Sequence, residues 1–455
     1  MSKKVEMEEI MEKERVEKLN PSQILINSFL VIIAIGTLLL MLPIATTDGQ
    51  GSGFVNALFT TTSAVAVTGL SIVDIGKEFT VFGQVVVMIL IQLGGLGIMT
   101  FSSVLMMIIK KKISYNEKVV LKEGLNHETL GGIIRFIRNI IKIVIIIEGI
   151  GAILLTIVFM KDYSFGKAFY YGVFHSISAF CNAGFALFPE NLIKYQNNYL
   201  LNFTISFLII FGGIGFAVIQ AVVYYFRDIK NRINLTSKIA INITMWLILF
   251  GTLIIFISEG KNSATIGNMD FFHKLSASFF QSVTTRTAGF NTIDMAQLRP
   301  ATIFLFYILM IIGASPGSTG GGIKTTTFGI IIVAVISNIK NRENIEIYNR
   351  TVNDEIVKRA LTVLGLSLMY ISVITISILL VENIEMTKIL FEVISAFATV
   401  GLSLGITSSL TVFSKILIIL TMFIGRVGPL TVAIALSEKK NKMKYKFPEE
   451  NISVG

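Results

Sequence analysis

The sequence has 455 residues, of which 53% are hydrophobic and only 15% are charged. A soluble domain of this size needs far more charged surface, so this balance excludes a soluble globular protein and predicts several membrane crossings. The net charge of +10 arises from short basic clusters between apolar runs, so we expect a lipid bilayer and no nucleic acid as the partner. The single cysteine, Cys181, excludes a disulfide framework.

The chain opens with a charged segment, residues 1–22, which lacks the apolar core of a signal peptide and is expected to be a cytoplasmic tail. One pattern then occurs four times: a long apolar run, a shorter one rich in hydroxyl groups, and a second long one. A short run cannot cross a bilayer and must enter and leave on the same side. We therefore predict eight spans and four re-entrant segments. The runs are 24–42, 54–66 and 79–109; 133–160, 168–181 and 200–226; 239–257, 271–285 and 302–339; and 356–381, 389–398 and 414–436.

The repeat predicts an all-α polytopic membrane protein with four parallel helix, re-entrant loop, helix units around a central pore. Two crossings per unit give all units one orientation, and the basic residues cluster between units and at the ends. The positive-inside rule then places both termini in the cytoplasm. The predicted units are residues 23–112, 113–235, 236–345 and 346–438, followed by a cytoplasmic tail, 439–455.

Each re-entrant segment ends in a short motif with a central glycine. Glycine can adopt backbone angles closed to other residues and can direct carbonyl groups toward an axis, where a ring of them replaces the hydration shell of a cation. Simple helix-packing glycines are the alternative, but four copies in register disfavour it. The pattern does not decide between potassium and sodium. The candidate ion-binding residues are Val67, Thr68 and Gly69; Asn182, Ala183 and Gly184; Thr287, Ala288 and Gly289; and Thr399, Val400 and Gly401.

A second glycine cluster lies in the last long run of each unit. In units one, two and four, we interpret it as helix packing through small residues. In unit three, the run of roughly 38 residues would be about 57 Å long as one helix, against a hydrocarbon core of about 30 Å, so it must break. The break is a glycine-rich loop beneath the motifs and a candidate gate. The candidate gate residues are Gly313, Ser315, Pro316, Gly317, Ser318, Thr319, Gly320, Gly321, Gly322, Lys324 and Arg426.

Arg426 lies in an apolar run, where a charge is costly and usually functional. It either repels cations or pins the unit-three loop, or it forms a structural salt bridge, for example with Glu148. Arg286 is expected to hold carbonyls of the motifs or nearby carboxylates, and His175 and His273 to be interfacial residues. Because no loop contains a nucleophile, base and orienting group, we expect no enzyme activity and no covalent cofactor.

As an ordered set, these motifs resemble the Trk, Ktr and HKT superfamily of potassium transporters, and within it the KtrB-type membrane subunit. The resemblance covers about residues 24–437. It rests on Thr68-Gly69-Leu70, Asn182-Ala183-Gly184-Phe185, Arg286 to Asn291, Ala398 to Leu402, Ser318 to Lys324 and Phe423 to Pro429. A departure is Pro316-Gly317, where many Ktr subunits have only small residues.

The resemblance implies four M1-P-M2 repeats, potassium at the carbonyls of the motifs, and a gate formed by the unit-three loop with Arg426. It also implies a homodimer in the bacterial plasma membrane, a cytoplasmic KtrA-type ring that binds ATP or ADP, and stimulation by sodium. The residues themselves leave three hypotheses: a channel-like potassium-uptake subunit, an alternating-access sodium/potassium symporter, and a membrane scaffold. Four parallel re-entrant segments argue against rocking of the repeats, and a scaffold has no use for them.

Overall fold

The computed structural model describes residues 21–97, 133–227, 233–342, 344–436 and 450. Nearly all of the predicted N-terminal tail (1–22), the basic run 110–112 and most of the predicted C-terminal tail (439–455) lie outside the described residues. The limits set between the four units stay predictions.

Each unit consists of a long helix, a short helix and a second helix or helix pair, and the fold class predicted from the sequence is confirmed. Unit one contains α2 (Pro21–Leu40), α3 (Phe54–Val65), α4 (Ile75–Glu78) and α5 (Val81–Leu96). Unit two contains α8 (Ile133–Phe159), α9 (Phe165–Phe180), α10 (Tyr199–Gly213) and α11 (Phe216–Arg227). Unit three contains α12 (Leu235–Glu259), α13 (Phe271–Thr284), α14 (Pro300–Ile311) and α15 (Thr325–Ile339). Unit four contains α16 (Asp354–Leu379), α17 (Met386–Phe397), α18 (Val412–Val427) and α19 (Pro429–Leu436). Four 3-10 turns, η1 (Pro43–Ala45), η2 (Ile193–Tyr195), η3 (Met295–Gln297) and η4 (Thr407–Ser409), lie in the connections, and a hairpin of β1 (Glu346–Ile347) and β2 (Arg350–Thr351) joins units three and four.

Side-chain caps fix where the second helices begin. The side chains of Thr80, Asn198 and Thr411 accept hydrogen bonds from backbone N–H groups in the first turns of α5, α10 and α18. In unit three, Pro300 at the first position of α14 takes this role, because its ring presets the helical φ angle. The start of the second helix is thus fixed locally in all four units, by a side-chain cap in three and by a proline in unit three.

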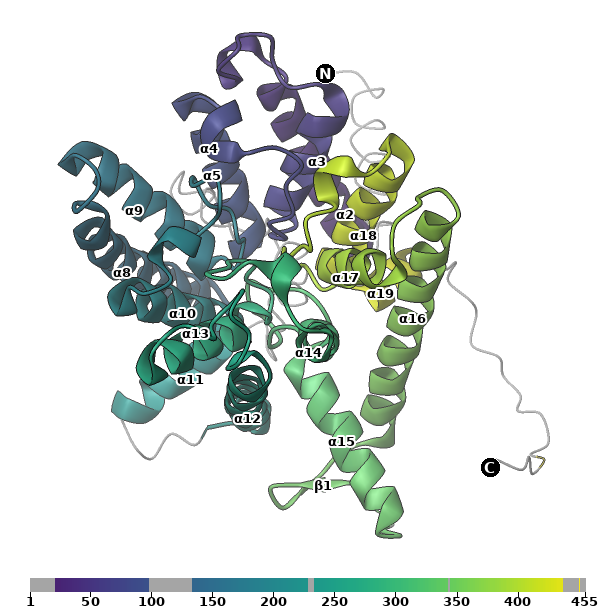
Figure 1. Cartoon of the computed structure of the whole chain (residues 1–455). Coiled ribbons are helices and arrows are strands. Elements are labelled where there is room, and N and C mark those ends of the chain that lie inside the picture. The colour runs from purple at the N-terminus through teal and green to yellow at the C-terminus, as the bar shows by residue number, and fades with distance from the viewer. Residues whose placement is uncertain (1–20, 98–132, 228–232, 343, 437–449, 451–455) are drawn as a thin grey trace, which may run out of the picture.

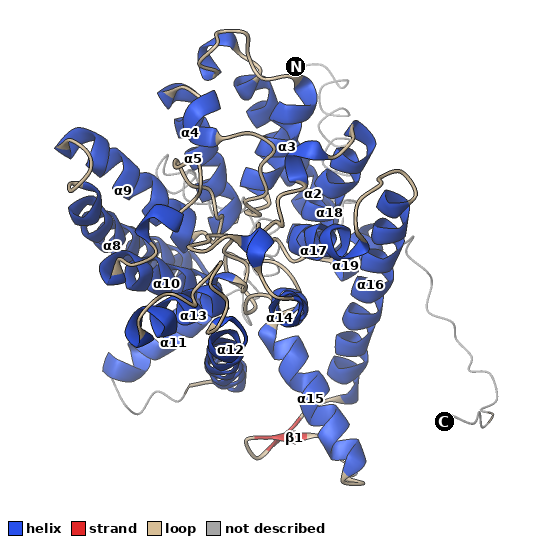
Figure 2. Cartoon of the chain, viewed as in Figure 1, coloured by secondary structure: helices blue, strands red, loops and turns tan. Residues whose placement is uncertain are grey.

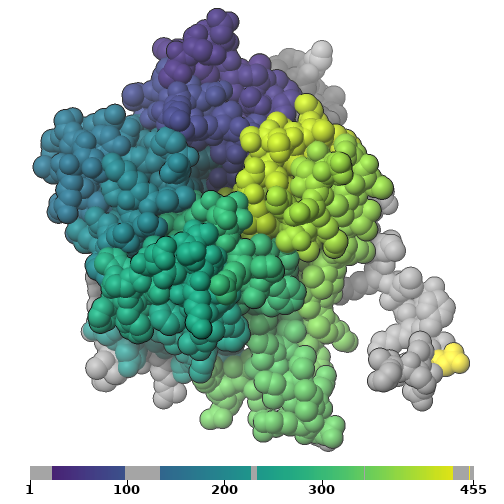
Figure 3. All heavy atoms as spheres, viewed as in Figure 1, coloured from purple at the N-terminus to yellow at the C-terminus, as the bar shows by residue number. Residues whose placement is uncertain are grey.

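The units close into a ring (Figure 1), and the space-filling view shows one lobe per unit around a centre (Figure 3). The second helix of each unit packs on the short helix of the next: α5 on α9, α10 on α13, α14 on α17, and α18 on α3. The last contact joins unit four to unit one. Figure 2 shows that the loops gather toward the middle of this ring.

Among the described residues, α2, α8, α12 and α16 are long and apolar enough to cross a bilayer on their own. Their outer faces expose large apolar side chains such as Ile145, Trp246 and Val373. Exposed apolar surface of this extent is stable against lipid and not against water. The first helix of every unit is therefore a candidate span.

In units one, two and four, the second helices are not the continuous helices that the sequence predicts, whereas the break predicted in unit three is present. α10 and α11 are bent by 100°, and α14 and α15 are separated by residues 312–324, which we call the unit-three loop. α5 ends at Gly97 (φ 83°) and α18 at Gly428 (φ 96°), and Gly215, between α10 and α11, has φ 101°. These angles are open mainly to glycine, so the break expected only in unit three has counterparts in the other three.

The packing interpretation is confirmed for one glycine in each of the other units. A Cβ on Gly94, Gly212 or Gly425 would collide with the carbonyl oxygen of the last residue of the short helix in the same unit: Val65, Phe180 or Phe397 respectively. These glycines let the second helix lie directly against the carbonyl end of the short helix. In units one, two and four, the second glycine cluster therefore both ends or bends the second helix and lets it pack closely on the short helix.

We expect Gly425→Ala to lower the unfolding free energy by about 1–3 kcal/mol, because the backbone it meets cannot give way. The matched control is Gly365→Ala in α16, where an added Cβ meets nothing within 4 Å. The control should leave stability unchanged or raise it slightly, since alanine favours helix over glycine. Thermal unfolding of both variants in detergent tests this, and equal melting temperatures would refute the packing argument.

Candidate ion pathway

The four candidate filter segments, residues 67–69, 182–184, 287–289 and 399–401, share one unusual backbone. Their first residues, Val67, Asn182, Thr287 and Thr399, have φ of 55°, 60°, 70° and 52°. Their glycines have φ of 90°, 68°, 77° and 92°, whereas the residues between are not in the positive-φ region. A β-branched residue in this region costs on the order of 1–3 kcal/mol and persists only where the surroundings enforce it. The same strain in three of four segments indicates a functional requirement.

The backbone amides of these segments are bonded on the side of the short helices. The N–H groups of Thr68, Ala183 and Val400 donate to the carbonyls of Ser63, Ser178 and Ser395 at 2.7–2.8 Å. The hydroxyl oxygens of Ser63 and Ser395 also accept from the N–H groups of Gly69 and Gly401 at 3.0 Å. Because the amides are engaged behind the segments, the carbonyls are left for the other side.

The four glycines and four carbonyls form a closed ring. A Cβ on Gly184 would lie 2.6 Å from the carbonyl oxygen of Ala288 and 2.9 Å from the Cα of Gly289. The other three glycines repeat this relation: each would meet the carbonyl oxygen before the next unit's glycine, in the order Gly69 to Ala183, Gly289 to Val400, and Gly401 to Thr68. All twelve candidate ion-binding residues therefore lie at or beside one point where the four units meet.

A cavity of 340 Å³ opens on one side of this ring. Gly69, Gly289 and Gly401 line it together with side chains of the connections that follow each segment, among them Asn191, Asn291 and Asp294. The Asn191 amide also donates to the Gly184 carbonyl at 3.4 Å. Residues of all four units thus border the cavity, which we call the outer cavity.

The unit-three loop lies in the break of unit two. The N–H groups of Ser315 and Thr319 donate to the carbonyls of Gly213 (2.9 Å) and Gly212 (3.2 Å). The N–H of Phe216 donates to Gly317 at 2.9 Å, so Pro316 and Gly317 sit where α10 ends.

Further along, the loop meets the first residues of the filter segments. The N–H of Gly321 donates to the Thr399 hydroxyl at 3.0 Å, and a Cβ on Gly320 would collide with the hydroxyl of Thr287. The small residues of the loop therefore allow its backbone to lie directly against the filter segments.

Arg426 and Lys324 hold this loop by its carbonyls. The Arg426 guanidinium donates to the carbonyls of Thr319 in the loop and of Gly94 and Gly95 at the end of α5. Lys324 Nζ donates to Gly320 at 2.7 Å. Glu148 instead accepts from the Gln92 amide at 3.1 and 3.2 Å, and no ion pair joins it to Arg426 among the described residues, so the structural salt bridge is not formed. The contacts of Arg426 fit pinning of the loop, and repulsion of cations stays a prediction.

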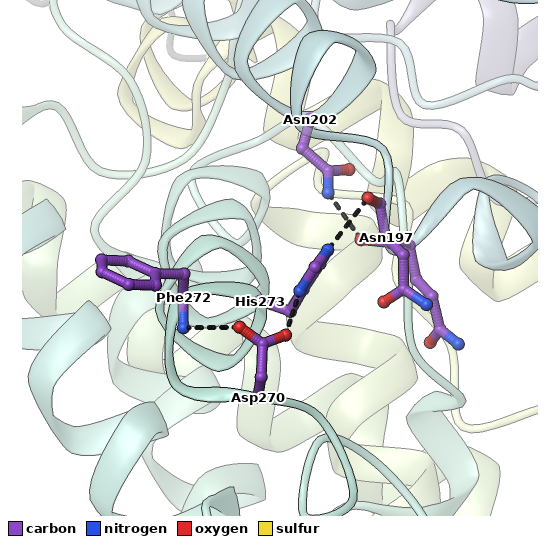
Figure 4. Close-up of polar contacts among 6 residues, drawn as sticks. Asn197, Asn202, Asp270, Phe272 and His273 are labelled. Carbon is purple, nitrogen blue, oxygen red and sulfur yellow. Dashed lines mark hydrogen bonds and ion pairs between the residues drawn. The ribbon is translucent and has the colours of Figure 1, made fainter.

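Three other expectations need correction or detail. The buried Arg286 donates to the Thr244 hydroxyl at 3.3 Å and, among the residues that the structure describes, not to a carbonyl of the motifs or to a carboxylate. His175 is fully buried, with Nδ1 2.7 Å from the Tyr171 carbonyl and Nε2 accepting from Leu187 N–H, so its assignment as an interfacial residue was wrong. His273 remains partly exposed and pairs with Asp270 (Figure 4).

One supporting residue was missed from the sequence. Glu392 in α17 is 1% exposed, and its two carboxylate oxygens accept from the hydroxyls of Ser403 (2.7 Å) and Thr407 (2.5 Å). It fixes the connection that follows Gly401. An acidic residue inside the apolar run 389–398 was the signal that could have indicated it, because such a charge is rarely buried without partners.

A ring of four units, each with a re-entrant helix ending at a glycine segment, defines a membrane protein built around a central pore. A profile of the TrkH family, described as cation transport protein, matches residues 7–445. The chain therefore belongs to the TrkH family of cation transport proteins, and the expectation that it is not an enzyme is confirmed.

Curated relatives match this chain over nearly their full length. The chain is 40% identical to the potassium/sodium uptake protein NtpJ of Enterococcus hirae over 98% of this chain and 100% of that one. It is also 40% identical to the Ktr system potassium uptake protein B of Bacillus subtilis, with the same coverage, and 36% identical to that of Vibrio alginolyticus over 95% and 94%. The crystal structure of the potassium transporter TrkH from Vibrio parahaemolyticus shares the fold, with a TM-score of 0.70 at 17% identity over 90% of this chain and 85% of that one.

Proposed function

We propose that this chain takes up potassium as the ion-translocating subunit of a Ktr-type system, in a channel-like manner. Potassium would bind to the carbonyls of the four candidate filter segments, and the inside-negative membrane potential would drive it inward. The closed ring of glycines and carbonyls carries this proposal, because it leaves four carbonyl-bearing segments facing one axis. The potassium-uptake names of relatives that match nearly the whole chain support it.

The gate in this proposal is the unit-three loop with Lys324 and Arg426. The support is that the loop contacts the filter segments of units three and four and is held by two cationic side chains. The positive charges of the Lys324 and Arg426 side chains next to the path would also disfavour passage of potassium.

The regulation and setting proposed for the chain come from its similarity to Ktr systems, whose name denotes more than one component. We propose a homodimer in the bacterial plasma membrane with both termini in the cytoplasm, where a KtrA-type ring that binds ATP or ADP opens the gate. Sodium is proposed as an activator, in keeping with the potassium/sodium uptake name of one relative.

Uptake of radioactive rubidium into proteoliposomes that contain only this chain tests the pathway. With an imposed inside-negative potential, we expect uptake that external potassium competes away and that rises when the regulatory ring is added. Absence of uptake in folded protein, with and without the ring, would refute the proposal. A fixed ratio of sodium to potassium carried per cycle would instead favour the alternating-access symporter.

A further inference from the structure

One carboxylate lies in the outer cavity beside the candidate filter. Asp294 follows the unit-three segment by five residues and caps η3, and its side chain lines the 340 Å³ cavity that Gly69, Gly289 and Gly401 also line. It is the one formally charged residue among those that line this cavity in the described part of the chain. The remaining lining is apolar or carries hydroxyl and amide groups.

The position of the Asp294 carboxylate is fixed by a hydrogen bond to one of its oxygens, and the other oxygen can interact with a cation. Asp294 Oδ1 accepts from the Ala296 N–H at 2.9 Å, which holds the side chain at the start of η3. Its second oxygen has no hydrogen bond or ion pair with any residue that the structure describes. Asp294 therefore keeps an uncompensated negative charge at the cavity.

A second carboxylate, Asp270, lines a neighbouring cavity but is already engaged. A second polar cavity of 600 Å³ shares Asp294 with the outer cavity and is also lined by Asp270 and His273. Asp270 pairs with His273 through one oxygen and accepts from the Phe272 N–H at 3.3 Å through the other (Figure 4). The hydrogen bond from His273 lowers the pKa of Asp270, so its charge is tied to a local partner.

We infer that Asp294 is the fixed charge that raises the concentration of monovalent cations at the outer mouth of the pore. Asp294 is exposed to the water of the cavity, and a single negative charge at such a mouth attracts cations and raises the rate at which they arrive, without distinguishing potassium from sodium. Asp294 would thus set how fast ions reach the ring, whereas the ring itself sets which ion passes. This inference rests on the proposed uptake function.

The test is the dependence of rubidium uptake on ionic strength in Asp294→Asn. Asparagine is nearly isosteric and still caps a helix turn, so it removes the charge and keeps the turn. Proteoliposomes are assayed at about 10 mM ionic strength, where the screening length is about 30 Å, and near 1 M, where it is about 3 Å, with an impermeant organic cation as the added salt. The regulatory ring is present in all samples.

At low ionic strength, we expect Asp294→Asn to lower the initial rate at subsaturating rubidium by roughly two- to fourfold, the effect of one charge several ångströms away in water. Near 1 M the difference should vanish. The maximal rate at saturating rubidium and the ratio of potassium to sodium competition should stay unchanged at both strengths.

The matched control is Glu385→Gln, which removes an exposed carboxylate next to α17 that lines neither cavity. It should follow wild type at both ionic strengths. An Asp294→Asn rate equal to wild type at low ionic strength, or a loss of the same size at both strengths, would overturn the inference while leaving the pore proposal standing. If wild type takes up no rubidium, the proposed function falls, and this inference with it.

Discussion

Gly184→Ser is expected to reduce rubidium uptake by at least about tenfold and to remove the preference of the remaining flux for potassium over sodium. The new Cβ would collide with the carbonyl oxygen of Ala288, 2.6 Å away, and with Gly289 Cα at 2.9 Å. Both are backbone atoms, so a carbonyl of the neighbouring segment must turn aside. A loss of only about 1.4 kcal/mol of ion stabilisation corresponds to tenfold.

The control for this variant separates backbone strain from collision. Gly49, in the connection between α2 and α3, has the same φ of 68° as Gly184, but an added Cβ there meets nothing within 4 Å. Gly49→Ser therefore carries the same left-handed strain, about 1–2 kcal/mol, away from the ring. Competition of potassium and sodium against rubidium uptake is measured for both. If Gly184→Ser behaves like Gly49→Ser, the ring is not the selective element.

Arg426→Gln is expected to raise rubidium flux in the absence of the regulatory ring by about tenfold or more. The substitution removes charge-assisted hydrogen bonds to the carbonyls of Thr319, Gly94 and Gly95, each worth about 1.5–3 kcal/mol. A shift of that size in favour of a released loop raises the open population by one or two powers of ten. Removing a cation below the filter acts in the same direction.

Two further variants make this result interpretable. Deletion of residues 315–320 removes the middle of the unit-three loop and leaves Arg426 in place, so it should also raise basal flux. Lys415→Gln takes a cation from the first turn of the same helix, α18, and should leave flux unchanged. Monodispersity in detergent checks folding. Unchanged or lower flux in both folded variants, Arg426→Gln and the deletion, would refute the gate.

The short helices could be predicted closely from the sequence, because apolar runs that stop at a Thr-Gly or Ala-Gly motif have a clear end. The predicted run 54–66 corresponds to Phe54–Val65, and 271–285 to Phe271–Thr284. The bend at Gly215 could not be predicted, because whether a glycine adopts a positive φ depends on what packs around it. In this protein, the unit-three loop occupies that bend.

At the candidate site, too, some features could be predicted from the sequence and others could not. The residues of the motifs could be located from their fourfold register alone, but their pairing could not, since each glycine contacts a carbonyl of a different unit. The partners of Arg426 show this most clearly: the sequence offered Glu148, whereas the structure brings the guanidinium to backbone carbonyls, which carry no residue-specific signal.

The closure of the ring also has a consequence for the order of assembly during synthesis. The ring is closed where Gly401 lies against the Thr68 carbonyl, and the hydrogen bond from Arg426 to the Gly94 carbonyl spans 332 positions of the chain. Contacts between such distant positions form late, because they require the intervening chain to be ordered first. A ribosome that has released only three units into the membrane has made an assembly in which the contacts between units one and four are still missing. If the ring is the proposed ion path, no conducting path is expected before the fourth unit has been inserted.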